Sequence, residues 1–225
     1  MEKTTEEILQ EIRKKLRLRM DGINSSSMRQ KGIRYKLNFG VPIMTLRQLA
    51  KEYAKNEALA EALWKEDIRE FKILALLLEP ENSFTKANDR VKGINNIELA
   101  EQACMHLFSK MPEREKYAGQ WIVSPELYIR ICGFLLYARL FTQGHPLDEK
   151  EEKEEYFTAV FHAVNGESLL LKNAAVTSLK QLGRQSVLIS KDILAACKTN
   201  MLLYNAELQF LYEELEGDFD FFYSA

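Results

Sequence analysis

Residues Asn95–Lys110, NNIELAEQACMHLFSK, lie near the middle of the chain and decide how the rest of it is interpreted. At about 100° per residue, the apolar side chains of this stretch fall on one side of a helix. They are Ile97, Leu99, Ala100, Ala103, Cys104, Leu107 and Phe108. Asn96 is a suitable N-cap, and Glu98 falls in the first turn, where the helix dipole favours an acid. Glu101 lies at the edge of the apolar stripe, so its carboxylate is expected where a packed face meets either solvent or a groove.

The segments on either side repeat this helical pattern. Helices are predicted over residues 5–20, 45–55, 57–65, 67–79, 84–93, 112–121, 125–141, 148–164, 167–182, 187–198 and 203–216. Two of them, 67–79 and 125–141, are more apolar than a surface helix, which indicates that they lie inside a two-layer array. Glycine and serine break the pattern over residues 21–32, which we interpret as a loop with at most a short helical turn. No segment alternates with the period of a strand, so the chain is predicted to be all-α.

The spacing of the most apolar helices indicates how they are arranged. They begin near residues 68, 97, 126, 168 and 203. Such a spacing, roughly 30 to 40 residues, is typical of helical pairs stacked in a HEAT or armadillo array. A closed helical bundle is the alternative. We expect an α-α superhelix, a HEAT/ARM-like solenoid of about six antiparallel helical pairs, forming a single domain over residues 1–225.

Composition limits the classes of function. The 225 residues are 46% hydrophobic and 28% charged, as in an ordinary soluble globular protein. With a formal net charge of -2 there is no global positive field, so a site for a polyanion requires a local basic patch. Cys104, Cys132 and Cys197 are widely spaced and odd in number, which favours reduced thiols and a cytoplasmic location. The sequence predicts neither a signal peptide nor a membrane span.

Most familiar catalytic and metal-binding motifs are missing from the sequence, including a glycine-rich phosphate loop, paired CxxC, HExxH and a nucleophile elbow. Cys104 and His106 are two residues apart and point to different faces of a helix, so we expect no metal and no cofactor. The acidic run over residues 148–155 is interpreted as a solvated helix start rather than an interaction patch. The aromatic tail GDFDFFYSA either caps the last repeat, folds into a groove or docks on a second subunit.

Basic residues recur on the inner helices and raise the question of nucleic acid. Arg47 and Lys51 are one turn apart, as are Lys180 and Arg184. Each pair shares a helix face and could bind successive phosphates. The other basic residues considered on these helices are Arg69, Arg130, Arg139 and Lys172. Because 31 basic residues scattered over the chain also produce such pairs by chance, spacing alone leaves nucleic-acid binding open.

Two stretches resemble the bacterial DNA alkylation repair proteins of the AlkD type. FGVPIMTLRQLAK, residues Phe39–Lys51, is similar to that family's Gly-Val, Leu-Arg and Ala-Lys stretch, and Trp64 followed by Arg69-Glu70-Phe71 is similar to its next helix. The resemblance implies a HEAT-like solenoid that holds duplex DNA in a basic concave face. It also implies cleavage of the N-glycosidic bond of cationic N3- or N7-alkylated purines, without a metal.

The resemblance assigns roles to individual residues. The family's Trp-x-x-x-Asp falls on Ile97–Glu101, so Glu101 takes the place of the catalytic aspartate and Ile97 replaces a groove tryptophan. In the later family helix, Thr177 stands where a second tryptophan would be and Lys180 stands where an arginine would be. Together with the spacing of basic residues, the resemblance predicts DNA contacts at Arg47, Lys51, Arg130, Lys172 and Lys180.

The expected function is therefore DNA binding in a concave basic groove. Glycosylase activity on cationic alkylpurines is expected to be weakened or lost, because both aromatic platforms are replaced while the carboxylate is one methylene longer. The alternative is a non-catalytic helical-repeat module that binds a protein partner or an unusual DNA structure.

Overall fold

The computed structural model describes residues 3–80, 87–147, 150–201 and 206–224. Across these ranges the secondary structure is helical without a strand, and strand-type pairing there is confined to one parallel bridge between Leu37 and Ile68. The all-α prediction is confirmed. The helices group into two compact units, the first formed by Met1–Ala87 with Lys110–Pro112 and the second by Asn88–Ser109 with Glu113–Ala225. The single domain over residues 1–225 stays a prediction.

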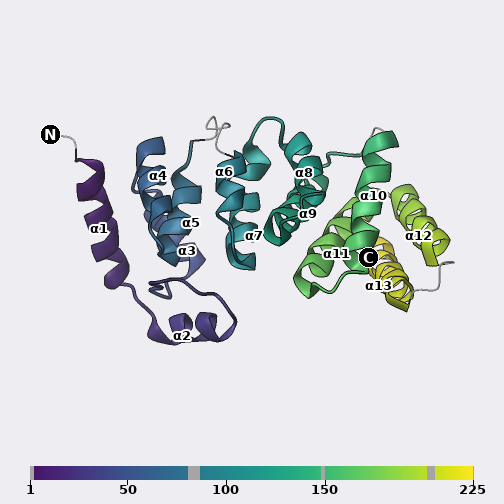
Figure 1. Cartoon of the computed structure of the whole chain (residues 1–225), viewed down its shortest axis with the longest axis horizontal. Helices are drawn as coiled ribbons and strands as arrows, with labels where there is room; N and C mark the ends of the chain where they lie inside the picture. The colour runs from purple at the N-terminus through teal and green to yellow at the C-terminus, as the bar shows by residue number, and fades with distance from the viewer. Residues whose placement is uncertain (1–2, 81–86, 148–149, 202–205, 225) are drawn as a thin grey trace. The chain divides into compact units, whose positions relative to one another are not determined.

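Among its described residues, the first unit contains five α-helices, seen from purple to blue in Figure 1. They are α1 (Thr5–Arg17), α2 (Gly22–Gln30), α3 (Ile43–Ala50), α4 (Glu57–Lys65) and α5 (Arg69–Leu78). Helix α5 packs against α3 and α4, and α4 also packs against α1. Eight of the ten residues of α5 are buried, as its apolar sequence predicts. Helix α4 has the predicted bounds and is capped by Asn56, whose side chain accepts the N–H of Leu59 at 2.9 Å.

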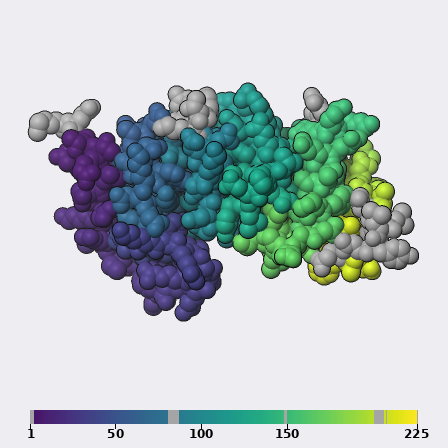
Figure 2. All heavy atoms as spheres, viewed as in Figure 1, coloured from purple at the N-terminus to yellow at the C-terminus, as the bar shows by residue number. Residues whose placement is uncertain are grey.

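Helix α2 corrects the prediction of a loop over residues 21–32. The carboxylate of Asp21 accepts the backbone N–H of Asn24 at 3.0 Å and so caps the helix. Ser25 is the buried residue of α2, and its hydroxyl donates to the carbonyl of Asn38 at 2.9 Å. Because α2 buries almost no apolar surface, its sequence carries no apolar periodicity. Figure 2 shows its side chains at the lower edge of the first unit.

A buried ion pair joins the two stretches on which the family resemblance rests. Arg69 and Glu70 are both fully buried at the start of α5, with Arg69 Nη1 2.9 Å from Glu70 Oε1. The Glu70 carboxylate accepts the backbone N–H groups of Phe39 at 3.0 Å and Val41 at 3.2 Å. Arg69 also donates to the carbonyl of Val41 at 2.9 Å. These contacts, here called the Arg69–Glu70 clamp, hold the segment before α3 against α5.

Gly40 lies inside the clamped segment and has to be glycine. Its φ is +73°, and a Cβ at this position would lie 2.0 Å from the carbonyl oxygen of Asp21. The backbone can come this close because glycine has no side chain. The adjacent carbonyl, that of Phe39, accepts the N–H of Asp21 at 2.8 Å. The Gly-Val of the family-like motif is therefore a packing requirement of the fold.

The second unit begins with α6 (Ala87–Lys92) and continues to the C-terminal helix (Figure 1). Its further helices are α7 (Ile97–His106), α8 (Arg114–Ile122), α9 (Leu127–Thr142), α10 (Lys150–Val164), α11 (Leu169–Gly183), α12 (Val187–Met201) and α13 (Ala206–Ser224). Helices α8 and α9, α10 and α11, and α12 and α13 pack as consecutive pairs. Helix α9 also contacts α7 and α11, and α11 contacts α13, so these four form one layer. This is the two-layer stacking of a HEAT-like repeat. Of the helix predicted over residues 84–93, residues 84–86 lie outside the described residues.

The aromatic tail is part of α13, which continues past the predicted end at Glu216. The ring of Phe219 lies over Gly183 at the end of α11, where an added Cβ would be 2.2 Å from Phe219 Cζ. The Tyr223 hydroxyl donates to the carbonyl of Gly183 at 2.7 Å. The tail thus covers the end of α11, the first of the three placements considered from the sequence.

Candidate functional site

Helix α7 positions Glu101 through its capping and its buried face. The Asn96 side chain accepts the N–H of Leu99 at 3.0 Å, as expected for an N-cap. The apolar stripe is buried from Leu99 onward, and the thiol of Cys104 donates to the carbonyl of Cys132 on α9 at 3.4 Å. Glu101 itself is exposed. The carboxylate is therefore held at the edge of a fixed helix, as predicted.

Glu101 lines a hollow formed by three helices of one layer, α7, α9 and α11. The hollow has a volume of about 220 Å³ and is here called the Glu101 hollow. Its lining residues are Glu101, Gln102, Cys104, Met105, Leu135, Ala138, Arg139, Thr142, Thr177 and Gln181. The structure thus brings Glu101 together with Thr177, two of the predicted site positions. Ile97 is half-buried and does not belong to this lining.

The polar groups of the Glu101 hollow differ from those of an ordinary packed surface. Although the Glu101 side chain is exposed, the protein atoms around its carboxyl group partly desolvate it and raise its pKa, and the nearby Glu98 carboxylate raises the pKa further. Within the described part of the chain, Arg139 Nε and Gln102 Oε1 are buried without a hydrogen-bond partner. Gln102 is 9% exposed. Because buried polar groups are nearly always hydrogen-bonded, this guanidinium nitrogen and this amide oxygen are available to a polar ligand that enters the hollow.

Arg139 was recognised in the sequence only as one of several basic residues, and Gln102 was missed. Helix α9 buries ten of its sixteen residues, so its apolar residues occupy every side. A helix of this kind gives no stripe from which the direction of Arg139 could be deduced. A single polar residue on the buried side of α7 was the available signal for Gln102.

The lining of the hollow contains no aromatic residue; it includes Thr177, which stands in the place of one family tryptophan, but not Ile97, which stands in the place of the other. At the Thr177 position a hydroxyl donates back to the carbonyl of Asn173 at 2.7 Å. The hollow therefore offers a carboxylate, a guanidinium and amides to a ligand, without a flat apolar surface on which a base could stack.

The predicted DNA contacts of the first unit form an exposed pair. Arg47 on α3 and Lys51 at its C-terminal end are both exposed. They are one turn apart, as the sequence predicts, which suits contact with successive phosphates.

Lys180 on α11 is engaged by carboxylates of α13. Its ammonium lies 2.8 Å from Glu214 Oε1 and 3.7 Å from Asp218 Oδ1. One turn further on, Arg184 donates to both oxygens of Asp218, at 2.7 and 3.1 Å. Helix α13 thus places acidic groups against the basic pair that the sequence suggested for phosphates.

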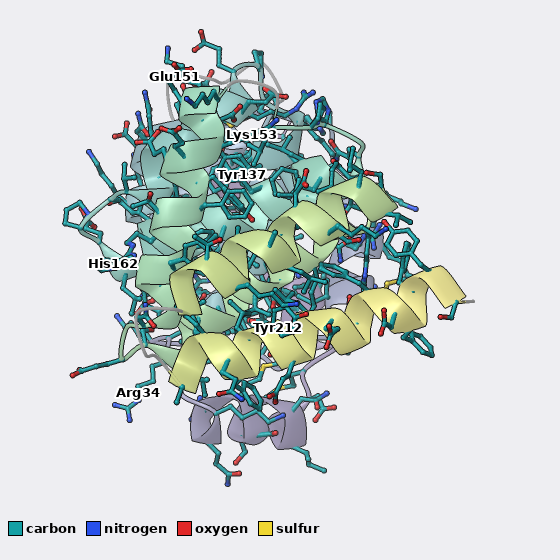
Figure 3. All side chains as sticks on the ribbon, turned by 90° about the vertical axis from the view of Figure 1, so that its right-hand side faces the viewer. Arg34, Tyr137, Glu151, Lys153, His162 and Tyr212 are labelled. Atoms are coloured by element: carbon teal, nitrogen blue, oxygen red, sulfur yellow. The ribbon has the colours of Figure 1, made fainter. Side chains whose placement is uncertain are left out.

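Arg130 and Lys172 lie outside the Glu101 hollow. Arg130 lines a separate hollow of about 690 Å³ between α8, α9 and α10, where its Nη2 is 3.3 Å from Nδ1 of His162. Glu151 also lines this hollow, and Figure 3 shows Glu151 and His162 toward opposite ends of α10. Lys172 on α11 lies 6.0 Å from the ring centroid of Phe210 on α13.

Neither a metal site nor a membrane span is found in the part of the chain that the structure describes. No group of three or more His, Cys, Asp or Glu side chains is placed there to hold a metal ion. None of the helices in the described ranges is long and apolar enough to cross a bilayer.

Comparison with known proteins agrees with this architecture. A family model described as DNA alkylation repair enzyme matches residues 12–201. A solved structure, described as a new family of proteins related to the HEAT-like repeat DNA glycosylases with affinity for branched DNA structures, superposes with a TM-score of 0.72. Its sequence is 15% identical, and the match covers 84% of this chain and 81% of that one. No curated protein sequence matches the chain significantly.

Proposed function

The chain belongs to the DNA alkylation repair enzyme family, and from this membership we propose that its Glu101 hollow receives a nucleotide of alkylated duplex DNA. In this proposal the Glu101 carboxylate stabilises positive charge on the sugar while a cationic N3- or N7-alkylated purine departs. The observation that carries the proposal is that Glu101 and Arg139 line one hollow in which a buried guanidinium nitrogen has no partner among the described residues.

The proposed chemistry needs few groups, because the leaving base already carries a positive charge. As the glycosidic bond breaks, its electron pair leaves with the base, which departs neutral, and the sugar becomes oxocarbenium-like. An ionised carboxylate near the sugar lowers the energy of that state. Water then adds to C1′ and loses a proton to solvent, which leaves an abasic sugar. Arg139 supplies a fork of donors suited to a phosphate oxygen beside the same nucleotide. Arg47 and Lys51 are proposed as further phosphate contacts.

We propose weaker phosphate contacts at the remaining predicted residues, Arg130, Lys172 and Lys180. Arg130 and Lys180 already have partners within the protein, on α10 and α13. A phosphate would have to compete with those partners, so each should contribute less affinity than an exposed arginine.

The expected rate is slow because the hollow lacks aromatic residues. Stacking of a base on an aromatic ring contributes about 1–3 kcal/mol in single-strand complexes. At a factor of ten per 1.4 kcal/mol, each missing ring costs roughly fivefold to a hundredfold.

The test is release of 7-methylguanine or 3-methyladenine from methylated duplex DNA, measured by chromatography with mass detection. We expect release above the spontaneous rate for the wild-type protein. Glu101→Gln keeps the size of the side chain, removes its charge and should abolish release while DNA binding persists. Glu167→Gln, an exposed residue outside the hollow, is the matched control and should leave release unchanged. Release equal to the spontaneous rate at saturating protein would exclude the catalytic role of Glu101.

DNA binding is tested separately, by fluorescence anisotropy at several salt concentrations. Each phosphate contact releases counterions, so log affinity should fall linearly with log salt. Arg139→Gln should weaken binding and reduce the slope by about one unit. Lys150→Gln on α10, whose ammonium is 3.7 Å from Glu154, is the control for loss of an exposed positive charge. Equal affinities for these two variants would remove Arg139 from the binding surface.

A second candidate function is non-catalytic binding of branched DNA. It is favoured by the lack of an aromatic platform in the Glu101 hollow, and it corresponds to the affinity described for the structurally similar protein. Tighter binding to a four-way junction than to a linear duplex of equal length, together with no base release, would support it against the glycosylase proposal.

A further inference from the structure

A second hollow adjoins the Glu101 hollow at the α11–α13 end of the second unit. It has a volume of about 480 Å³ and shares Thr142 and Gln181 with the Glu101 hollow. Its further lining includes Arg184 and Phe222, which gives it its name here, the Phe222 hollow. The two hollows are thus neighbours along one face of α9 and α11.

The Phe222 ring is presented by an anchored helix end. It is 44% exposed, and Arg184 Cζ lies 5.3 Å from its ring centroid. On either side along α13, the Phe219 ring is buried over Gly183 and the Tyr223 hydroxyl is hydrogen-bonded to the Gly183 carbonyl. Figure 3 shows α13 running across the near side of this unit. An aromatic surface that is half exposed and yet fixed in direction is suited to stacking.

The charges around the ring favour a neutral ligand over a phosphate. Arg184 donates through its Nε and Nη2 to the two carboxylate oxygens of Asp218, so its positive charge is balanced. The other polar groups of the hollow include the amides of Gln181 and Gln185. Gln185 is fixed in place because its Nε2 donates to two backbone carbonyls, at 2.9 and 3.0 Å. A flat ligand with hydrogen-bonding edges matches this surface.

We propose that the Phe222 hollow binds an unpaired base of DNA, stacked on the exposed side of the Phe222 ring. This inference rests on the proposed DNA binding and names the kind of DNA that the site prefers, one with a single-stranded segment beside a duplex. Helix α13 would then supply the aromatic contact that Ile97 and Thr177 do not supply on α7 and α11. Stacking on aromatic side chains tolerates any sequence, because every base has a flat face.

The test compares two probes, a blunt duplex and the same duplex with a single-stranded thymine overhang that contains one 2-aminopurine. We expect the wild-type protein to bind the overhang probe more tightly and to lower the 2-aminopurine emission. Phe222→Ala should weaken binding of the overhang probe about fivefold to tenfold, the lower part of the stacking range, because the ring is only partly exposed. Binding of the blunt duplex should be unchanged.

Three further variants make the test specific. Phe221→Ala removes the adjacent ring, which is 80% exposed and does not line the hollow, and should affect neither probe. Phe222→Leu keeps apolar bulk beneath Arg184 without an aromatic face, so it should show the loss even if the alanine variant unfolds. Phe222→Trp should retain or strengthen binding of the overhang probe.

The outcomes separate this inference from the proposed function. Equal affinity of wild type and Phe222→Leu for the overhang probe would overturn the inference while leaving duplex binding in place. An equal loss on both probes would overturn it as well, since the ring would then act on the duplex. Failure of the wild-type protein to bind either probe would overturn the proposed DNA binding and this inference together.

Discussion

Replacement of Glu70 by glutamine tests whether the Arg69–Glu70 clamp stabilises the first unit. The substitution keeps the shape of the side chain and removes its negative charge. In the native protein the carboxylate accepts the N–H groups of Phe39 and Val41 and one donor of Arg69. A glutamine can accept through one atom only, so its NH₂ group must face at least one of these donors.

The expected magnitude follows from the burial of the pair. Arg69 and Glu70 are both 0% exposed, so the arginine charge would remain buried without its partner carboxylate. Breaking a buried ion pair from one side costs about 3–5 kcal/mol. With a urea dependence of about 2–3 kcal/mol per molar, the unfolding midpoint of the first unit should fall by roughly 1–2.5 M.

The assay is urea unfolding followed by circular dichroism at 222 nm. Glu66→Gln is the control, because it removes an exposed carboxylate whose Oε2 lies 3.2 Å from Arg13. Exposed pairs of this kind contribute about 0–1 kcal/mol, so the midpoint should hardly move. A midpoint shift for Glu70→Gln no larger than that for Glu66→Gln would refute the argument that the clamp stabilises this unit.

Three further predictions concern the second unit. Gly183→Ala would place a methyl group 2.2 Å from the Phe219 ring of α13, so it should lower the free energy of unfolding by about 1–3 kcal/mol. The new Cβ of Gly217→Ala meets nothing within 4 Å, so this variant should raise the free energy of unfolding by about 0.4–1 kcal/mol. Urea midpoints that move in the same direction would contradict this pair. Burial raises the pKa of Cys197 to about 11, so at pH 8 this thiol should react with iodoacetamide far more slowly in the native protein than in the unfolded protein. The reaction is followed by mass spectrometry, and equal rates would show that the Cys197 thiol is accessible in the native protein. Partial desolvation and then Glu98 raise the pKa of Glu101, so base release should fall with decreasing pH already above the range in which an ordinary glutamate titrates. Glu98→Gln should move this acid limb of the pH profile to lower pH. An acid limb that does not move would mean that another group titrates.

Helices with a one-sided apolar pattern could be predicted from the sequence, together with their buried faces, caps and edge residues. In α7 the apolar stripe, the Asn96 cap and the edge position of Glu101 all agree with the structure. The reason is that burial against one neighbouring layer imposes a 3.6-residue period on the sequence.

Helix α2 could not be predicted in this way. It is held by its Asp21 cap and a hydrogen bond from Ser25, which leave no periodic trace in the sequence. Nor could the course of α13, because Gly217 is ordinarily a poor residue for the middle of a helix, by about 1 kcal/mol relative to alanine. The burial of Phe219 over Gly183, a contact between distant segments, supports the turn beyond Gly217.

Only part of the candidate site could be predicted from the sequence, because some of its contacts join separate helices. Glu101 and Thr177 could be assigned from the family resemblance, and they do line one hollow. The partners of Lys180 could not be anticipated, since Glu214 and Asp218 reach it only when α13 packs on α11. Side chains that meet across separate helices are determined by tertiary packing, which a single sequence does not display.

The position of the Arg69–Glu70 clamp limits what a likeness over residues 39–71 can indicate about another chain. Residues that the clamp needs, including Gly40 and Glu70, belong to the first unit, whereas those that line the Glu101 hollow belong to the second. Exchange of Glu101 or Thr177 for another residue leaves every contact of the clamp intact. A chain can therefore keep residues 39–71 unchanged while the lining of its Glu101 hollow changes, so likeness over residues 39–71 does not by itself indicate a common reaction.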